Sequence, residues 1–130
     1  MIIKPLFLIV DDEPEMCWVL EQVLRKSGYD CLRALSGQEA LSLVETNEFR
    51  MIFLDAKLPD VEGLELARRI RNLHPGIDIV MVSGYFYRDD ETIEKALSSG
   101  LIRTFIGKPF DHKEILATIR IGLAIPGSTQ

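Results

Sequence analysis

The stretch "LIVDDEPE", Leu8–Glu15, ends a run of apolar residues with two adjacent aspartates, Asp11 and Asp12. The apolar run begins at Leu6 and has no polar member, which is typical of a strand buried on both faces of a parallel sheet. Pro14 follows the acids, and proline favours the first turn of a helix. The stretch therefore predicts a buried strand, an acidic turn and a helix, and it raises the question why two like charges stand together.

The same alternation continues along the chain. Further strands are predicted at Tyr29–Leu35, Met51–Leu54, Ile79–Val82 and Thr104–Ile106, and the weaker first and last of these are expected near the edges of the sheet. Helices are predicted from Pro14 to Gly28, from Ser36 through Val44, at Leu64–Leu73, from Asp89 or Asp90 to Gly100, and from Asp111 through Leu123. Five strands interleaved with five helices predict a doubly wound α/β fold with a parallel sheet and helices on both faces.

Composition narrows the class of protein. The chain has 130 residues, 47% of them apolar and 27% charged, which fits one globular domain. The formal net charge of −5 argues against a nucleic-acid surface, and no apolar run approaches the ~20 residues that a membrane helix needs. Cys17 and Cys31 fit no metal motif, so we expect reduced thiols in a cytoplasmic protein. Residues 1–124 are expected to form the domain, and 125–130 a tail or the start of a linker.

Three acids follow predicted strands. Asp11 and Asp12 close the first strand and Asp55 closes the third, in "MIFLDAKLPDVEG". In the flavodoxin-like strand order 2-1-3-4-5, strands one and three flank the point where ligands bind. Two unit charges ~4 Å apart repel by about 4 kcal/mol at an effective dielectric constant near 20. Protonation of one acid would relieve this repulsion, and so would Mg²⁺, which prefers oxygen ligands.

A plainer alternative is that Asp11 and Asp12 only cap the following helix, since acids suit a helix N-terminus. The residues at two other strand ends favour a shared binding site. The fourth strand ends in "VSG", which includes Ser83, and the fifth ends in "GKPF", which includes Lys108. A hydroxyl and an ammonium group at the same rim as the acids together indicate a binding site, although each residue alone is ordinary.

These motifs resemble the receiver domain of two-component response regulators. The matching pieces are "LIVDDEPE", "FLDAKLPDVEGLEL", "VMVSGY" and "FIGKPF", in order and with the family's spacing, over about Lys4 to Leu123. The resemblance implies the flavodoxin-like (βα)5 sheet of order 2-1-3-4-5.

The resemblance also implies roles for individual residues. Asp55 would be the phosphoacceptor, and Asp11, Asp12, Asp55 and the backbone carbonyl of Lys57 would hold Mg²⁺, for which Mn²⁺ can substitute. Ser83 and Lys108 would bind the phosphoryl group, and Phe105 would be the switch aromatic residue. Pro59, Gly63 and Pro109 would shape the loops, with Pro109 following a cis peptide bond.

Three features depart from the usual family pattern. Lys57 stands two residues after Asp55 and Tyr85 two residues after Ser83, and the resemblance implies that both positions could tune hydrolysis of the phosphorylated form. The run "YFYRDD", Tyr85–Asp90, is unusually aromatic and is either packing over the sheet end or a docking patch for a partner. Leu101 replaces a more usual small residue after Gly100.

The resemblance implies a switch rather than an enzyme, with only self-catalysed phosphotransfer and autodephosphorylation. The expected upstream partner is a sensor histidine kinase or a phosphotransfer protein. The expected downstream partner is an output domain in the same longer chain or a separate protein, and transcription is one output that it could control. The expected output face comprises the fourth helix, fifth strand and fifth helix, through which the domain could form a homodimer. Direct binding of nucleic acid or membrane is not expected. Two alternatives stay open: a pseudo-receiver that binds partners without phosphorylation, and a Mg²⁺-dependent phosphohydrolase.

Overall fold

Strands and helices alternate along the chain as the sequence predicts. The computed structural model describes residues 5–84 and 91–124. The strands are β1 (Leu6–Val10), β2 (Asp30–Ala34), β3 (Met51–Asp55), β4 (Asp78–Ser83) and β5 (Thr104–Gly107). The helices are α1 (Pro14–Lys26), α2 (Gly37–Thr46), α3 (Gly63–Leu73), α4 (Glu91–Ser98) and α5 (His112–Ala124). The aromatic run Tyr85–Asp90 and the expected tail 125–130 lie outside the described residues.

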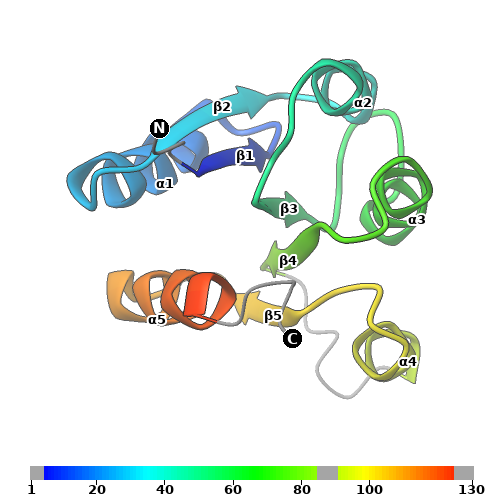
Figure 1. Cartoon of the computed structure of the whole chain (residues 1–130). Helices are drawn as coiled ribbons and strands as arrows, with labels where there is room; N and C mark the ends of the chain where they lie inside the picture. Colours follow the sequence, from blue (N-terminus) through cyan, green and yellow to red (C-terminus); the bar gives the residue numbers. More distant parts are fainter. Residues whose placement is uncertain (1–4, 85–90, 125–130) are drawn as a thin grey trace.

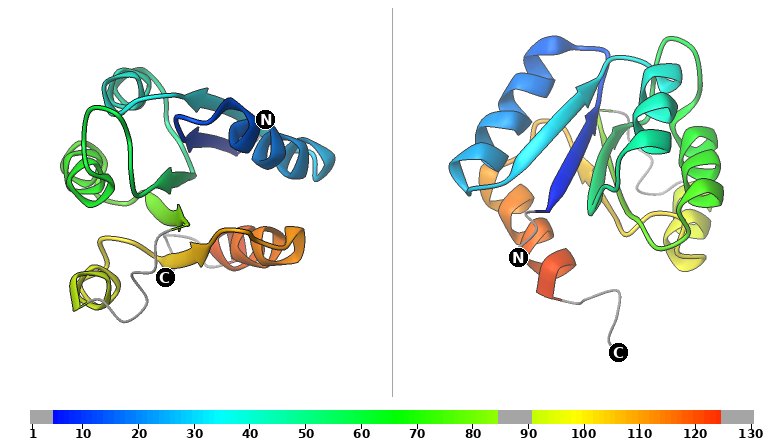
Figure 2. Two further views of the ribbon diagram at one scale, coloured as in Figure 1. Left: turned by 180° about the vertical axis from the view of Figure 1, so that it is seen from behind. Right: turned by 45° about the horizontal axis from the view of Figure 1, so that its top comes forward.

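All five strands form one parallel sheet in the order β2-β1-β3-β4-β5. The two weaker predicted strands, β2 and β5, are the edges, which confirms the expectation from their shorter apolar runs. Helices α1 and α5 cover one face of the sheet, and α2, α3 and α4 cover the other (Figure 1). The view in Figure 2 that brings the top forward shows β1 and β2 running side by side in the same direction between these two layers.

Each face of the sheet has its own hydrophobic core. Phe7 and Ile9 of β1 pack with α1 and α5, whereas Leu8 and Val10 pack with the helices of the other face. Successive side chains of a strand point to opposite faces, so a strand covered on both sides must be apolar at every position. This arrangement explains the uninterrupted apolar runs in the sequence.

Side-chain caps confirm the predicted starts of two helices. The Ser36 hydroxyl accepts a hydrogen bond from the amide of Glu39 at 3.1 Å at the start of α2. At α5 the Asp111 carboxylate accepts from the amide of Lys113 at 2.8 Å, and the Glu114 carboxylate accepts from the amide of Asp111 at 3.1 Å. These bonds satisfy amides that have no partner within the helix.

Two predicted apolar stripes are wrong in one position each. In α1 the buried stripe includes Cys17, which is fully buried, in place of the half-buried Met16. In α4 the buried residues are Ile93 and Ala96, and Leu97 is 39% exposed. Neighbouring residues point about 100° apart on a helix, so the way each helix docks decides which of two apolar neighbours is buried.

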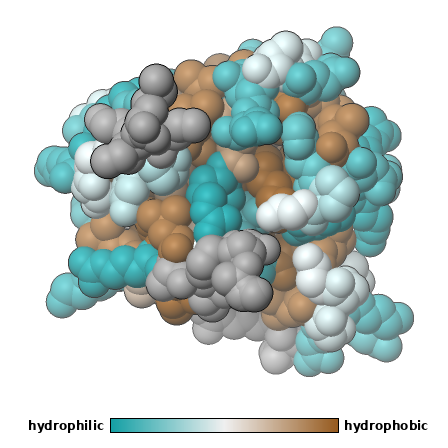
Figure 3. Space-filling view, viewed as in Figure 1, coloured by the Kyte–Doolittle hydropathy of each residue, from teal (hydrophilic) through white to brown (hydrophobic). Residues whose placement is uncertain are grey.

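Within the described ranges, every helix is too short or too polar to cross a membrane. Hydrophilic and hydrophobic side chains are interspersed on the face shown in Figure 3.

Candidate functional site

The carboxyl ends of four strands meet at one rim of the sheet. In the parallel register Val10 of β1 lies beside Leu54 of β3, Asp55 beside Val82 of β4, and Ser83 beside Gly107 of β5. The residues that end or follow these strands, Asp11, Asp55, Ser83 and Lys108, therefore project from adjacent strands at the same edge. The fold therefore brings the ends of these four strands to one edge of the sheet, as the sequence predicted.

Three carboxylates cluster at this rim. Asp11, Asp12 and Asp55 each offer one oxygen, and these oxygens lie within 4.8 Å of one another. Asp11 and Asp55 are buried and Asp12 is exposed. Helix α1 has Glu13 at its N-cap position and receives no side-chain cap there, so the capping alternative for Asp11 and Asp12 does not describe this turn. Instead the Asp11 carboxylate accepts a hydrogen bond from the Glu13 amide at 2.9 Å.

Lys108 reaches into the acidic cluster. Its Nζ donates to the Asp11 carboxylate at 2.8 Å and lies 3.6 Å from Asp55 and 3.6 Å from Glu13. Burial opposes its charge, but the hydrogen bond to Asp11 and the neighbouring negative charges outweigh burial and raise the pKa of Lys108. The ammonium group is therefore a fixed cation within contact distance of the carboxylates.

Asp55 is the acid whose ionisation is most strongly perturbed. Burial raises its pKa, the positive charge of Lys108 opposes that rise, and the charge of Asp11 adds to it, which places the pKa of Asp55 at about 6 instead of 3.8. The site thus holds a carboxylate that is poorly stabilised as an anion unless a further cation joins it.

The structure also places the other predicted residues. Ser83 is 1% exposed at the end of β4, and its carbonyl accepts a hydrogen bond from the Lys108 amide at 2.9 Å. Phe105 in β5 is partly buried against the core of the α2, α3 and α4 face. The peptide bond between Lys108 and Pro109 is cis, as the resemblance implied. Tyr85 lies outside the described residues.

The loop after Asp55 folds back onto the strand that carries this residue. The Gly63 amide donates to the Ala56 carbonyl at 2.9 Å. A Cβ atom at Gly63 would lie 2.7 Å from the Asp55 carbonyl oxygen and 2.8 Å from the Ala56 Cα, so the backbones approach too closely for any other residue. Lys57, with an exposed side chain, forms an isolated antiparallel bridge with Glu62, and Pro59 is exposed in the same loop.

Two contacts at the site were not predicted from the sequence. Glu13 approaches Lys108, and its signal was its place in the same acidic run as Asp11 and Asp12. The Cys17 thiol donates to the Asp11 carbonyl at 3.3 Å. Burial first, and then the charge of Asp11, raise the pKa of Cys17 to about 11, so this thiol stays protonated and supports the turn. No sequence signal distinguished Cys17 from an ordinary core residue.

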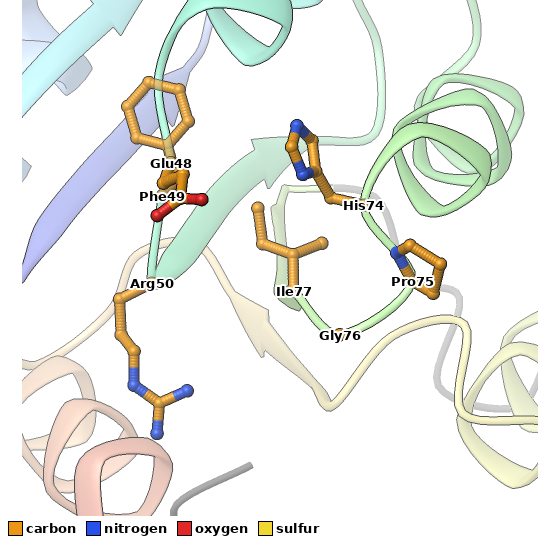
Figure 4. Close-up of a pocket in the computed structure, with 7 residues that line it drawn as sticks. All are labelled: Glu48, Phe49, Arg50, His74, Pro75, Gly76 and Ile77. Atoms are coloured by element: carbon orange, nitrogen blue, oxygen red, sulfur yellow. The ribbon is translucent and has the colours of Figure 1, made fainter. Parts of the chain in front are cut away.

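A separate pocket lies where strands begin, between the segment before β3 and the segment before β4 (Figure 4). The His74 ring nitrogen Nε2 lies 2.9 Å from the Val44 carbonyl oxygen, and Arg50 extends toward α5, where it donates to the Gly122 carbonyl. Both side chains tie neighbouring segments together. The lining residues are Glu48, Phe49, Arg50, His74, Pro75, Gly76 and Ile77.

The chain belongs to the response regulator receiver domain family, whose sequence profile matches residues 7–120. Receiver domains are signalling domains of two-component systems, and phosphorylation and Mg²⁺ binding are typical of them.

Two curated relatives are transcriptional regulators. The chain is 32% identical over 117 residues to the transcriptional regulatory protein ZraR of Escherichia coli K12. It is 33% identical over 114 residues to the alkaline phosphatase synthesis transcriptional regulatory protein PhoP of Bacillus subtilis. These matches cover 90% and 87% of this chain but only 26% and 46% of the relatives, so the chain spans less than half of either.

Solved structures show the same fold. A CheY-like response regulator receiver domain protein from Methanospirillum hungatei is 32% identical, with a TM-score of 0.86 and coverage of 94% of this chain and 95% of that one. The response regulator TrrA from Thermotoga maritima, solved in complex with Mg²⁺-BeF, is 29% identical, with a TM-score of 0.79 and coverage of 91% and 98%. These neighbours confirm the predicted flavodoxin-like architecture.

Proposed function

We propose that this domain is a phosphorylation-dependent switch in which Asp55 accepts a phosphoryl group from a histidine kinase or phosphotransfer protein. One observation carries the proposal: carboxylate oxygens of Asp11, Asp12 and Asp55 lie within 4.8 Å of one another, and the Lys108 ammonium stands 3.6 Å from Asp55. Receiver-family membership supports it.

The donor set fits Mg²⁺. Three carboxylate oxygens within 4.8 Å of one another are hard ligands of the kind this ion prefers, and Mn²⁺ shares that preference. Asp11, Asp12, Asp55 and the Lys57 carbonyl would hold the cation, and TrrA, the relative solved with Mg²⁺-BeF, supports this assignment. When bound, Mg²⁺ supplies charge neutralisation for the incoming phosphoryl group.

The chain's own residues account for the transfer. An Asp55 carboxylate oxygen attacks phosphorus, forming a P–O bond, while the P–N bond of the donor phosphohistidine breaks and its electron pair leaves with the imidazole nitrogen. With a pKa of about 6, Asp55 is mostly ionised at neutral pH and so can act as the nucleophile. Lys108 would pair with the phosphoryl oxygens and Ser83 would donate a hydrogen bond to them.

The output would pass through the α4-β5-α5 face. A phosphoryl group adds about two negative charges and new hydrogen-bond acceptors, to which Ser83 would turn. Phe105, only partly buried beside β4, would then move inward and alter that face. The face would bind a partner, a second copy or an output domain. ZraR and PhoP are transcriptional regulators, so transcription is the output we propose.

Intact mass spectrometry after incubation with acetyl phosphate and Mg²⁺ tests the proposal. The wild-type chain is expected to gain one phosphoryl group and Asp55→Asn none. Asp30→Asn, which changes an exposed aspartate at the start of β2, is the matched control and is expected to keep the adduct. An adduct that persists in Asp55→Asn would reject the site.

Two other outcomes identify the alternatives. A wild-type chain that gains no phosphoryl group and binds no Mg²⁺ is a pseudo-receiver that acts only as a binding module. Steady turnover of a phosphate ester beyond one equivalent of protein indicates a phosphohydrolase. If the chain is phosphorylated, changing Lys57 or Tyr85 to alanine is expected to alter the decay rate of the adduct more than its formation.

A further inference from the structure

An aspartate of the β3–α3 loop reaches across to a different helix. The two carboxylate oxygens of Asp60 accept hydrogen bonds from the first amides of α2, at 2.8 Å from Gly37 and 2.9 Å from Gln38. Helix α2 already has a local cap, because Ser36 accepts from the Glu39 amide. Asp60 therefore serves the two amides that the local cap leaves open.

The loop and the helix are also fitted to each other sterically. Gly37 is buried, and a Cβ atom added there would lie 2.2 Å from the Val61 side chain and 3.3 Å from the Asp60 carboxylate. Any larger residue at Gly37 would push the Val61 side chain away from the start of α2. Asp60 and Val61, one polar and one apolar, therefore both contact the start of α2 at Gly37.

The charge of Asp60 suits this contact. The hydrogen bonds from the Gly37 and Gln38 amides hold the pKa of Asp60 below its ordinary value, so the carboxylate is an anion at neutral pH. The start of a helix carries a partial positive charge, which attracts an anion. The contact therefore joins a negative charge to the positive end of the helix at neutral pH.

The other end of the same loop is fastened to α3. The Glu62 carboxylate accepts from the amides of Leu64 at 3.1 Å and Glu65 at 3.2 Å. The backbone of Glu62 pairs with Lys57 in an antiparallel bridge. Lys57 is therefore connected to α3 through Glu62, and three residues after Lys57 the same loop is connected to α2 through Asp60.

We propose that Asp60 is a positioning residue whose carboxylate fastens the β3–α3 loop to α2 and so holds the Lys57 backbone where the cation of the proposed function binds. This inference rests on that function. Release of Asp60 removes the hydrogen bonds from the loop to α2, whereas the Lys57–Glu62 bridge and the packing of Leu58 and Val61 remain, so the Lys57 carbonyl is held less firmly. Outer partners of metal ligands typically contribute about 10- to 100-fold in affinity, and we expect the lower end for this exposed contact.

The variants Asp60→Ala and Ser36→Ala separate positioning from helix capping, because each removes a cap from the start of α2 but only the first frees the loop. Mg²⁺ affinity by calorimetry is expected to fall about tenfold in Asp60→Ala and to stay unchanged in Ser36→Ala. Amide hydrogen exchange of residues 56–62, measured without Mg²⁺, is expected to accelerate only in Asp60→Ala. Asp60→Asn, which keeps a capping oxygen, is expected to recover part of both, and it replaces Asp60→Ala if that variant does not fold.

Three results would decide against these ideas in different ways. Wild-type affinity and wild-type exchange in Asp60→Ala would overturn the positioning role. Equal effects of Asp60→Ala and Ser36→Ala would show that Asp60 is only a helix cap. A wild-type chain that binds no Mg²⁺ would overturn the proposed function itself, and the positioning role with it.

Discussion

Replacing Asp55 by asparagine is expected to stabilise the domain at neutral pH and to lose that advantage in acid. Asp55 is 8% exposed, and burial together with Asp11 raises its pKa from 3.8 to about 6 despite Lys108. Asparagine keeps nearly the same shape but carries no charge. The substitution therefore removes the cost of holding an ionised carboxylate in this pocket.

The magnitude follows from the two pKa values. A tenfold change in an ionisation constant corresponds to about 1.4 kcal/mol, so the difference between 3.8 and about 6 corresponds to about 3 kcal/mol. Between these two pH values the folded state keeps a proton that the unfolded state has already released. The free energy of unfolding therefore falls as the pH rises through this window, and the full cost is present above the folded-state pKa.

Urea unfolding followed by circular dichroism measures this effect. In EDTA at about pH 8, the free energy of unfolding of Asp55→Asn is expected to exceed that of the wild type by up to about 3 kcal/mol. The difference is expected to vanish as the pH falls below 3.8, where Asp55 is protonated in both the folded and the unfolded state. Saturating Mg²⁺ is expected to shrink the difference at the higher pH, because a cation held in the proposed site would stabilise the folded wild type. Asp30→Asn, which changes an exposed aspartate at the start of β2, is the matched control.

A difference between Asp55→Asn and the wild type that does not change with pH would refute this reasoning. A variant less stable than the wild type at about pH 8 in EDTA would refute it too, since the ionised carboxylate would then be stabilised by its surroundings.

Three further predictions concern the same framework. Gly63→Ala is expected to lower the free energy of urea unfolding by about 1–3 kcal/mol and to abolish Mg²⁺ binding, because the added Cβ would press on the backbone of Asp55. A wild-type free energy of unfolding together with wild-type Mg²⁺ affinity would contradict this prediction. Lys108→Met is expected to raise the pKa of Asp55 further, because the opposing cation is lost. NMR titration of the Asp55 carboxyl carbon measures this pKa, and a midpoint at lower pH than in the wild type would contradict the prediction. Arg71→Met is expected to lower the free energy of unfolding by about 1–3 kcal/mol and to speed amide exchange around Gly100, because the guanidinium donates to carbonyls of two loops. Unchanged amide exchange would contradict this prediction.

Much of the site could be predicted because its residues follow strands. Continuous apolar runs identify strands buried on both faces, and parallel strands bring their carboxyl ends to one rim. Asp11, Asp55, Ser83 and Lys108 could therefore be placed together before any coordinates were known. The loop-shaping role of Gly63 could be inferred only from the resemblance, and its cause, the close approach to the Asp55 backbone, is visible only in the folded chain.

The sequence alone determined the alternation of strands and helices, the parallel sheet and the residues at its rim, because hydrophobic periodicity and helix caps are local properties. Tertiary structure decided which apolar neighbour of α1 is buried, that Glu13 approaches Lys108, and that Asp60 binds α2. It also decided the raised pKa of Asp55. These features depend on how elements distant in sequence pack against each other, and no local pattern contains those distances or the burial that results from them.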